Sequence, residues 1–360
     1  MKKKIYIYGV TSSHNLGDNV ICDTFFYFVK TKSPSSRIIV RDINYVPLIF
    51  KVIRKILIIL GLQYKKLNSF AQKYFSFWGN SRDAIVVFAG GQLFYDYFVN
   101  DIISIVKAAS YKKIGVYFYG CGTGCIEGKN KNDLIEILKN PNVVMVTLRD
   151  DYIGLRDAIL NISIVPDVAI CCNVMSVSYR KEKSNIIGIG VISIDNYNKQ
   201  NHKQVTEEYY ISSMCGMIVK LKQVGYEIEL FSNGNEEDQL MADKIQSFLK
   251  NNFPITIAPQ PSTAKELITI ENKYTYVIAS RLHAMIIAYS YNIPFWGICW
   301  DEKIISFCKC IGTYDNYTML NDIDNIDIKI ILKKLVEGYD DSIRESLISN
   351  INQKIEFIIK

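Results

Sequence analysis

Residues 280–288 read Ser-Arg-Leu-His-Ala-Met-Ile-Ile-Ala, and they join a strand to a helix. The apolar run Tyr276–Ala279 comes just before them and predicts the strand, while the helix is expected to run to about Tyr291. A second strand is expected over Pro294–Ile298. Strand, helix and strand in direct succession form the repeating unit of a doubly wound α/β domain. This stretch therefore predicts a parallel sheet with helices on both faces.

The start of that helix carries groups suited to a small anion. Backbone N–H groups near Leu282 would point at whatever lies above them, with a partial positive charge. Arg281 adds a planar fork of donors, and His283 adds a side chain that exchanges a proton near neutral pH. We therefore expect a multiply charged anion here. The alternative is that Arg281 pairs with an acidic neighbour and His283 is a hydrogen-bonded core residue.

The alternation of strands and helices occurs twice along the 360 residues, which are enough for two domains. The first run covers 1–175. The second covers 186–325, with strands and helices expected at 186–192, 207–223, 227–231, 236–250, 255–258 and 264–271. The polar stretch Val174–Asn185 reads as the linker, and residues 326–360 read as a helical tail. The predicted fold class is α/β, with two doubly wound Rossmann-like domains facing a cleft.

Near the N-terminus, a loop is expected over Thr11–Asp18, before a helix that begins near Asn19. Gly17 permits a tight turn in this loop, and Asp18 suits a helix N-cap because a carboxylate accepts backbone N–H bonds. Capping is one interpretation of Asp18. The other is that Asn15 and Asp18 bind sugar hydroxyls, which can donate to carboxylate and amide oxygens.

Two glycine runs follow apolar strands in the first half of the chain. Gly90 and Gly91 come after the run Ala84–Ala89 and allow a ligand to approach the backbone closely. The second run, Gly120–Gly124, follows a strand at 115–119, and it occurs too late in the chain to be strong support for a dinucleotide motif.

Arg149 follows a further apolar strand, Val143–Leu148. Its guanidinium can clamp a carboxylate or a phosphate. The alternative is an internal ion pair with Asp150 or Asp167.

The segment Pro47–Leu67 combines many apolar residues with five cations and no acid. Lys51, Arg54 and Lys55 follow helical spacing and so share one side of a predicted helix. One interpretation is a core-packed helix with a solvated basic side. The other is a helix that lies on a membrane surface and meets acidic headgroups.

Composition narrows the class of protein. Hydrophobic residues make up 49% and charged residues 22%, as in globular proteins, and the net charge of +6 is mild. Nine cysteines without a CxxC pair, and only three histidines, do not favour a zinc site. The first residues read as a strand rather than a signal peptide, so we expect reduced thiols and a cytoplasmic protein. No nucleic-acid partner is expected.

Taken together, several of these elements resemble the polysaccharide pyruvyl transferase family. The most specific block comprises Ser280-Arg281-Leu282-His283, Ala288, Ile293-Pro294, Asp301-Glu302-Lys303-Ile304 and Phe307. Weaker matches are His14-Asn15-Leu16-Gly17-Asp18-Asn19, Arg149-Asp150 and Val165-Pro166-Asp167-Val168-Ala169. The glycine runs depart from the family pattern at Gln92, Thr123 and Cys125.

The resemblance implies a glycosyltransferase-B-like enzyme with the acceptor on the N-terminal domain and the donor on the C-terminal domain. It implies transfer of the enolpyruvyl unit of phosphoenolpyruvate onto a sugar of a surface or capsular polysaccharide, which forms a pyruvate ketal and releases phosphate. His283 would be the general acid and Asp18 the base. Substrate contacts would come from Arg281, Arg149, Leu282, Asn15, Gly90 and Gly91. Phosphoenolpyruvate is then a substrate, and neither a metal nor another cofactor is expected.

Two other functions stay open at this point. One is a nucleotide-sugar glycosyltransferase of the same architecture, for which Glu302 is a candidate ribose ligand. The other is a carbohydrate-binding relative without catalysis. For the transferase, the expected partner besides phosphoenolpyruvate is a lipid-linked saccharide at the inner face of the cytoplasmic membrane, where the basic apolar segment would give peripheral attachment.

Overall fold

The computed structural model describes residues 3–45, 48–60, 77, 83–150, 152–159, 162–175, 185–200, 205–249 and 253–360. Most of the expected linker, from 176 to 184, lies outside these ranges, and so does the second part of the basic apolar segment, from 61 to 67. The chain divides into two compact units. Unit 1 comprises Met1–Ser12, Ile21–Val168 and Asn350–Lys360, and unit 2 comprises Ser13–Val20 and Ala169–Ser349.

Unit 1 is built on a seven-stranded sheet in which every pair of strands is parallel. The order is β2-β1-β3-β5-β6-β7, with β4 beside β5. The strands are β1 Lys4–Gly9, β2 Arg37–Asp42, β3 Ala84–Phe88, β4 Gly91–Phe94, β5 Gly115–Thr123, β6 Val143–Leu148 and β7 Ser163–Ile164. All five residues of β3 are buried, as expected for a strand covered on both faces.

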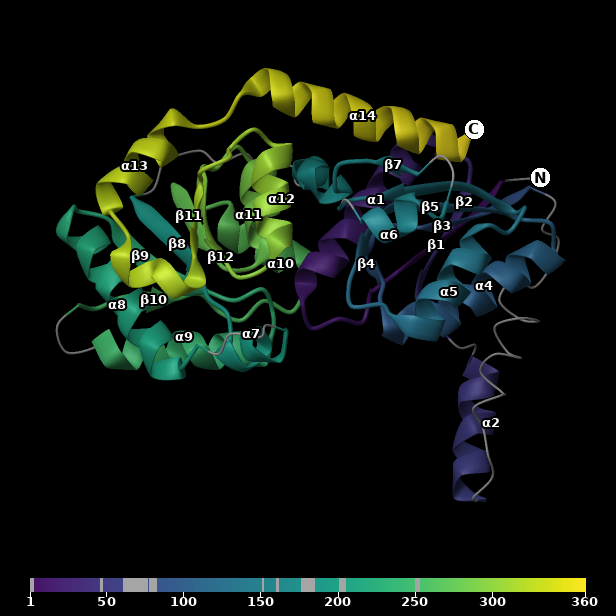
Figure 1. Ribbon diagram of the computed structural model, residues 1–360, viewed down its shortest axis with the longest axis horizontal. Helices are drawn as coiled ribbons and strands as arrows, with labels where there is room; N and C mark the ends of the chain where they lie inside the picture. The colour runs from purple at the N-terminus through teal and green to yellow at the C-terminus, as the bar shows by residue number, and fades with distance from the viewer. Residues whose placement is uncertain are drawn as a thin grey trace. The chain divides into compact units, whose positions relative to one another are not determined.

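The helices of unit 1 lie on both faces of this sheet, except α2, which projects away from it (Figure 1). They are α1 Leu16–Lys32, α2 Leu48–Ile59, α4 Val99–Tyr111, α5 Gly128–Leu138 and α6 Ile153–Arg156, with the short 3₁₀ turn η1 Asp96–Phe98. Helix α4 buries Val99, Ile102 and Val106, which recur at helical spacing, in the core. In the same core Phe88 of β3 stacks on Phe118 of β5 with ring centroids 4.4 Å apart.

Unit 2 has a six-stranded parallel sheet in the order β10-β9-β8-β11-β12-β13. Its strands are β8 Ile186–Gly190, β9 Glu227–Phe231, β10 Thr256–Ile257, β11 Tyr276–Ala279, β12 Phe295–Cys299 and β13 Tyr317–Met319. In chain order this is 3-2-1-4-5-6, the arrangement of a Rossmann domain. The direction of winding reverses between β8 and β11, so the carboxyl ends of these two strands are where a ligand is expected.

The helices of unit 2 are α7 Ile194–Gln200, α8 Glu207–Gln223, α9 Glu236–Leu249, α10 Ala264–Glu271, α11 Leu282–Ser290, α12 Glu302–Cys310 and α13 Ile328–Glu337, with 3₁₀ segments η2 Val168–Met175 and η3 Leu320–Asn325. Several of them begin at a side-chain cap. The Thr206 hydroxyl accepts from the N–H of Tyr209 at 3.1 Å, and Asp301 accepts from the N–H of Lys303 at 3.0 Å. Each satisfies a backbone donor that the helix itself cannot.

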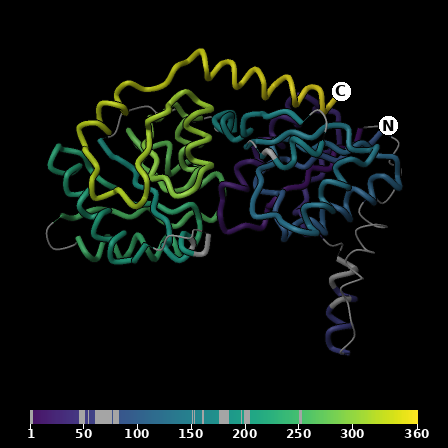
Figure 2. Tube along the Cα trace, viewed as in Figure 1, coloured from purple at the N-terminus to yellow at the C-terminus, as the bar shows by residue number. Residues whose placement is uncertain are grey.

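The C-terminal helix α14, Asp341–Ile359, begins in unit 2 and ends in unit 1. Its last turns bury Ile351, Ile355 and Ile358. The end of the chain lies beside its start, where the trace in Figure 2 brings yellow next to purple, because Lys3 Nζ donates to the carbonyl of Ile359 at 2.8 Å. Lys32 of α1 also pairs with Glu356 at 2.6 Å.

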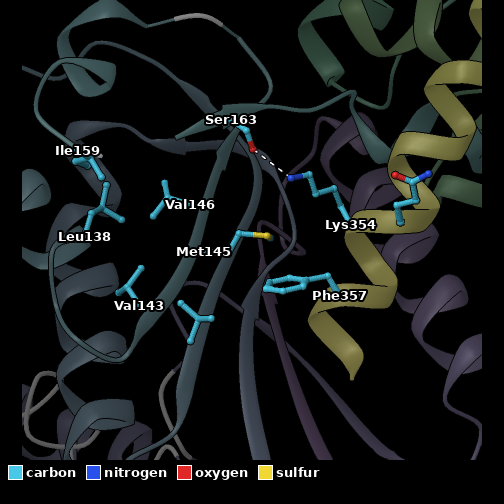
Figure 3. A pocket seen from close by; sticks show the side chains of 10 residues that line it. Leu138, Val143, Met145, Val146, Ile159, Ser163, Lys354 and Phe357 are labelled. Atoms are coloured by element: carbon cyan, nitrogen blue, oxygen red, sulfur yellow. Dashed lines mark hydrogen bonds between the residues drawn. The ribbon is translucent and has the colours of Figure 1, made fainter. Parts of the chain in front are cut away.

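A cavity of about 550 Å³ remains between β6 and α14 (Figure 3). Its lining includes Val143, Met145, Val146, Ser163 and Phe357. Lys354 crosses it, with Nζ 3.5 Å from the Ser163 hydroxyl. None of the residues that the sequence marks as a site lines this cavity.

The structure differs from the sequence-based prediction in three local ways. Helix α1 begins at Leu16, so Asp18 lies in its first turn and Asn15 takes the position before the helix, with its carbonyl accepting from the N–H of Asp18 at 3.2 Å. Strand β5 continues to Thr123 because Gly91 and Phe94 of β4 pair with its end, so the second glycine run is largely strand. Strand β13 has no apolar alternation long enough to predict it.

Candidate functional site

The candidate site lies at the carboxyl ends of β8 and β11 in unit 2. The N–H of Ser280 donates to the carbonyl of Gly190 at 3.0 Å, which continues the pairing to the last residue of β8. Trp300 holds the turn after β11, because its indole N–H donates to the Ser280 carbonyl at 2.5 Å. Helix α11 then begins at Leu282, with Arg281 at the N-cap position in extended geometry. The N-terminus of α11 therefore lies at the edge where the winding reverses.

Arg281 is held by a buried carboxylate of α9. Its Nε and Nη2 donate to the two oxygens of Asp238 at 2.8 and 2.9 Å, and Asp238 is fully buried. Asp238 also accepts from the N–H of Ser193, just after β8, at 2.8 Å. The acidic partner anticipated as one interpretation of Arg281 is thus present. The pair engages one edge of a guanidinium that has five N–H donors, so a ligand contact through the other edge stays a prediction.

His283 lies in the first turn of α11, with 7% of its surface exposed. Its ring packs on Gly17 of α1: a Cβ added at Gly17 would lie 2.5 Å from the Cβ of His283 and closer still to the ring atoms Cγ and Nδ1. Only a residue without a side chain can occupy this position without moving the imidazole. The Asn15–Asp18 element and the Arg281–His283 element, far apart in sequence, therefore meet within unit 2.

Asn233, which follows β9, joins this group although the sequence gave no reason to single it out. Its carbonyl accepts from the N–H of Leu16 at 2.9 Å, and a Cβ at the next residue, Gly234, would lie 2.6 Å from the carbonyl of His14. Its side chain is fully buried, and within the described part of the chain neither amide atom has a hydrogen-bond partner. The same holds for the side-chain oxygen of Asn15. The signal was the Ser-Asn-Gly sequence after an apolar strand, which is common in ordinary turns.

A buried amide atom without a hydrogen-bond partner destabilises the folded protein. These two asparagines therefore indicate which hydrogen-bonding groups a ligand would have to supply. Asn233 lacks partners for both a donor and an acceptor, so the conclusion does not depend on which way its amide is turned. A sugar hydroxyl both donates and accepts, whereas ionised carboxylate and phosphate groups only accept. The pair therefore suits a hydroxylated ligand beside the start of α11.

The remaining predicted residues lie in unit 1. Gly90 and Gly91 have positive φ angles of 91° and 77°, which favour glycine. A Cβ at Gly90 would lie 3.2 Å from the carbonyl of Tyr119, so the close approach observed here is to a neighbouring strand. Gln92, in the place of a third glycine, packs its amide on Gly124, where an added Cβ would lie 3.3 Å from its Cδ.

Arg149 of unit 1 is buried between two carboxylates. Its Nη1 lies 2.8 Å from Asp167, and its Nε lies 3.3 Å from Asp150. Burial alone would lower the pKa of this guanidinium, but the two carboxylates outweigh burial and raise the pKa. The internal ion pair anticipated for Arg149 is therefore present, and its contact with substrate stays a prediction. A Cβ at Gly122 would lie 2.7 Å from Nη2, so the glycine run makes room for this side chain.

Other chemistry finds less support in the described residues. There, no group of three or more His, Cys, Asp or Glu side chains is arranged to hold a metal ion. Burial raises the pKa of the Cys121 thiol, which disfavours the thiolate that a nucleophile needs. No helix within the described ranges is both long and apolar enough to cross a bilayer.

Comparison with solved structures confirms the fold class. A putative UDP-N-acetylglucosamine 2-epimerase from Listeria monocytogenes is similar, with a TM-score of 0.57, 11% identity, and coverage of 96% of this chain and 94% of that one. The UDP-GlcNAc 2-epimerase of Methanocaldococcus jannaschii, in complex with UDP-GlcNAc and UDP, gives a TM-score of 0.53 at 12% identity, with 98% and 100% coverage. Identity this low shows the fold alone, which is glycosyltransferase-B-like with two parallel sheets.

Sequence comparison goes further than the structural likeness. No curated protein matches the chain. The family model described as polysaccharide pyruvyl transferase, however, matches residues 15–302. The match begins at Asn15 and includes Gly17, Arg149, Asn233, Asp238 and the start of α11. With most of its length matched, this chain belongs to the polysaccharide pyruvyl transferase family.

Proposed function

We propose that the protein transfers the enolpyruvyl unit of phosphoenolpyruvate to a sugar of a polysaccharide repeat unit. The observation that carries this proposal is the packing of Gly17 on the His283 ring at the start of α11. It joins an anion-binding helix start and a proton-exchanging group to an element whose buried amides suit hydroxyls. A donor with carboxylate and phosphate groups, and an acceptor with hydroxyls, match these two halves.

In the proposed reaction, the donor is held by the N–H groups at Leu282 and by Arg281, whose orientation Asp238 fixes. His283 protonates the methylene carbon of phosphoenolpyruvate, and positive charge develops at the neighbouring carbon. One sugar hydroxyl adds at that carbon and gives up its proton, to Asp18 in this scheme. Phosphate leaves with its bonding electrons, a second hydroxyl closes the ketal, and the two hydroxyl protons end on the new methyl group and on phosphate.

Asn15 and Asn233 fit the acceptor side of this scheme. The buried amide of Asn233 lacks partners for both its donor and its acceptor, and the buried oxygen of Asn15 lacks a donor; a sugar hydroxyl can donate and accept, whereas ionised carboxylate and phosphate groups only accept. Replacing Asn233 by Leu, similar in size and without polar atoms, should raise the KM for the saccharide and leave the KM for phosphoenolpyruvate unchanged. Equal increases in both constants would place Asn233 outside the acceptor site.

The direct test is incubation with phosphoenolpyruvate and a panel of lipid-linked saccharides. We expect phosphate release that depends on the saccharide, together with a product whose mass corresponds to a pyruvate ketal. A parallel panel of UDP-sugars tests the glycosyltransferase alternative. Consumption of a UDP-sugar without release of phosphate from phosphoenolpyruvate would refute the proposal.

Two variants separate the proposed roles of the helix-start residues. Arg281→Lys should raise the KM for phosphoenolpyruvate about tenfold or more, because a point ammonium cannot replace the fork held by Asp238. His283→Ala should lower kcat by about 10²–10⁴ with little change in donor binding, the range for a lost general acid. Turnover at the wild-type rate in the His283 variant would remove this residue as the acid.

A further inference from the structure

Helix α2 exposes the apolar side that a helix of a globular domain normally buries. Val52, Ile56 and Ile59 are 51%, 50% and 82% exposed, and their spacing places them in one stripe along the helix. Leu60 beside this stripe is 63% exposed, and Ile58, on the basic side of the helix, is 51% exposed. Isolated exposed apolar residues are ordinary, but a contiguous set of this kind marks a surface that binds something. The core-packed interpretation of this helix is therefore not the one that the structure supports.

The charge of the helix indicates what it binds. By helical spacing Lys55 adjoins the apolar stripe, Lys51 lies next to Lys55, and Arg54 lies farther round on the same basic side; the whole sequence from Pro47 to Leu67 has no acidic residue. Two copies of the helix packed stripe to stripe would bring cations together without a single acid to pair with them. An anionic surface, in contrast, complements both the stripe and its cationic border.

Length decides how the helix would lie on such a surface. Its 12 residues extend roughly 18 Å, at about 1.5 Å per residue. A bilayer core of about 30 Å is too thick for a helix of this length to cross. An amphipathic helix of this kind lies in the plane of the interface, with its apolar side among the acyl chains and its cations at the headgroups.

We propose that α2 is a membrane-docking helix that attaches the protein to a bilayer surface rich in anionic lipid. Its apolar stripe, Val52–Ile56–Ile59, inserts below the headgroups, and its cations bind them from above. The attachment is reversible and weakens as salt rises, because the electrostatic part is screened while no spanning segment holds the protein. This inference rests on α2 alone and stands whether or not the proposed reaction is correct.

The test is co-sedimentation of the full chain with vesicles of phosphatidylglycerol and phosphatidylcholine, compared with vesicles of phosphatidylcholine alone. At low salt we expect at least tenfold stronger binding to the anionic vesicles, since each cation near such a surface contributes about fivefold. High salt should remove most of this difference. If the wild-type protein does not bind anionic vesicles at low salt, the proposal is wrong.

Two variants assign the binding to α2. Val52→Ser, Ile56→Ser, Ile59→Ser removes the stripe, and Lys51→Glu, Arg54→Glu, Lys55→Glu reverses the charge; each should reduce vesicle binding at least about tenfold. The matched control is Lys329→Glu, Lys333→Glu, Lys334→Glu on α13, which changes the net charge equally and should leave binding unchanged. An equal loss in the control would show that net charge alone is responsible, which overturns the assignment.

Circular dichroism melts of each variant establish that the fold is retained, as expected for exposed positions. Sedimentation velocity without lipid addresses the competing occupant, a second copy of the chain. The proposal requires the same mass for the wild-type and stripe variants. If the wild type is a dimer, and the stripe variant is a monomer that binds vesicles as well as the wild type does, the stripe is a protein interface and the proposal fails.

Discussion

Gly17→Ala tests the central contact of the site, because it adds one methyl group where there is no room for it. The new Cβ would lie 2.5 Å from the Cβ of His283 and closer still to its ring. Carbon atoms in contact normally lie about 3.5–4.0 Å apart, so the imidazole or α1 must move by about 1 Å or more. Overpacking of this kind costs about 1–3 kcal/mol.

A second effect opposes the first. Gly17 lies within α1, where alanine is favoured over glycine by about 1 kcal/mol. The net change in the free energy of unfolding should therefore be a loss of about 0–2 kcal/mol. Turnover should change far more than stability, because a displacement of about 1 Å at a reacting group can lower the rate about 10²-fold.

Gly216→Ala is the matched control. Gly216 also lies within a helix, α8, but an added Cβ there meets nothing within 4 Å. This variant should gain about 1 kcal/mol and keep its turnover. Urea unfolding gives the stabilities, and phosphate release from phosphoenolpyruvate gives kcat.

The coupling between the two residues completes the test. In a His283→Ala background the ring contacts are removed while the Cβ contact at 2.5 Å remains, so Gly17→Ala should destabilise the protein less there than it does in the wild type. The reasoning is refuted if Gly17→Ala stabilises the wild type as much as the control does and leaves kcat unchanged. A loss of stability with normal kcat would support the contact between Gly17 and His283 and would contradict a catalytic role for His283.

Substitutions at three carboxyl groups, two buried and one half-buried, give further tests. Asp238→Ala should cost about 3–5 kcal/mol in urea unfolding because it leaves Arg281 without its carboxylate, and Asp238→Asn should cost less; equal losses would mean that charge is unimportant. Burial raises the pKa of Glu271 well above 4.5, so its stabilising contribution is complete below pH 4.5 and declines as the pH rises toward the folded pKa. Glu271→Gln should therefore stabilise by on the order of 1 kcal/mol per pH unit above that value in thermal melts, whereas a gain independent of pH would contradict this. For Asp42, burial alone would raise the pKa, but donors from residues 44, 12 and 11 lower it below 3.8. Asp42→Asn should accordingly destabilise at neutral pH, and the deficit should shrink as the pH falls below 3.8 toward the folded pKa; a deficit unchanged in acid would count against the hydrogen bonds as its cause.

Local patterns in the sequence were sufficient for the elements and the fold class. Glu207–Gln223 and Val143–Leu148 appear with the predicted bounds, because apolar periodicity and capping residues act within a few residues along the chain. Two successive runs of strand and helix likewise implied two doubly wound sheets. The family resemblance, read from the block around Ser280–His283, holds over residues 15–302.

The partners of the site residues were decided by tertiary structure alone. Asp238 lies 43 residues before Arg281, and nothing in the local sequence of either residue indicates that the other is its partner. Ser13–Val20 belongs with unit 2 although it is followed and preceded by chain of unit 1, and this is what brings Gly17 to His283. Such contacts depend on the order of strands in the sheet, which hydrophobic pattern does not encode. The same holds for α2: an amphipathic sequence has the same periodicity whether its apolar side is covered or exposed, and only the folded chain shows that Val52, Ile56 and Ile59 are exposed.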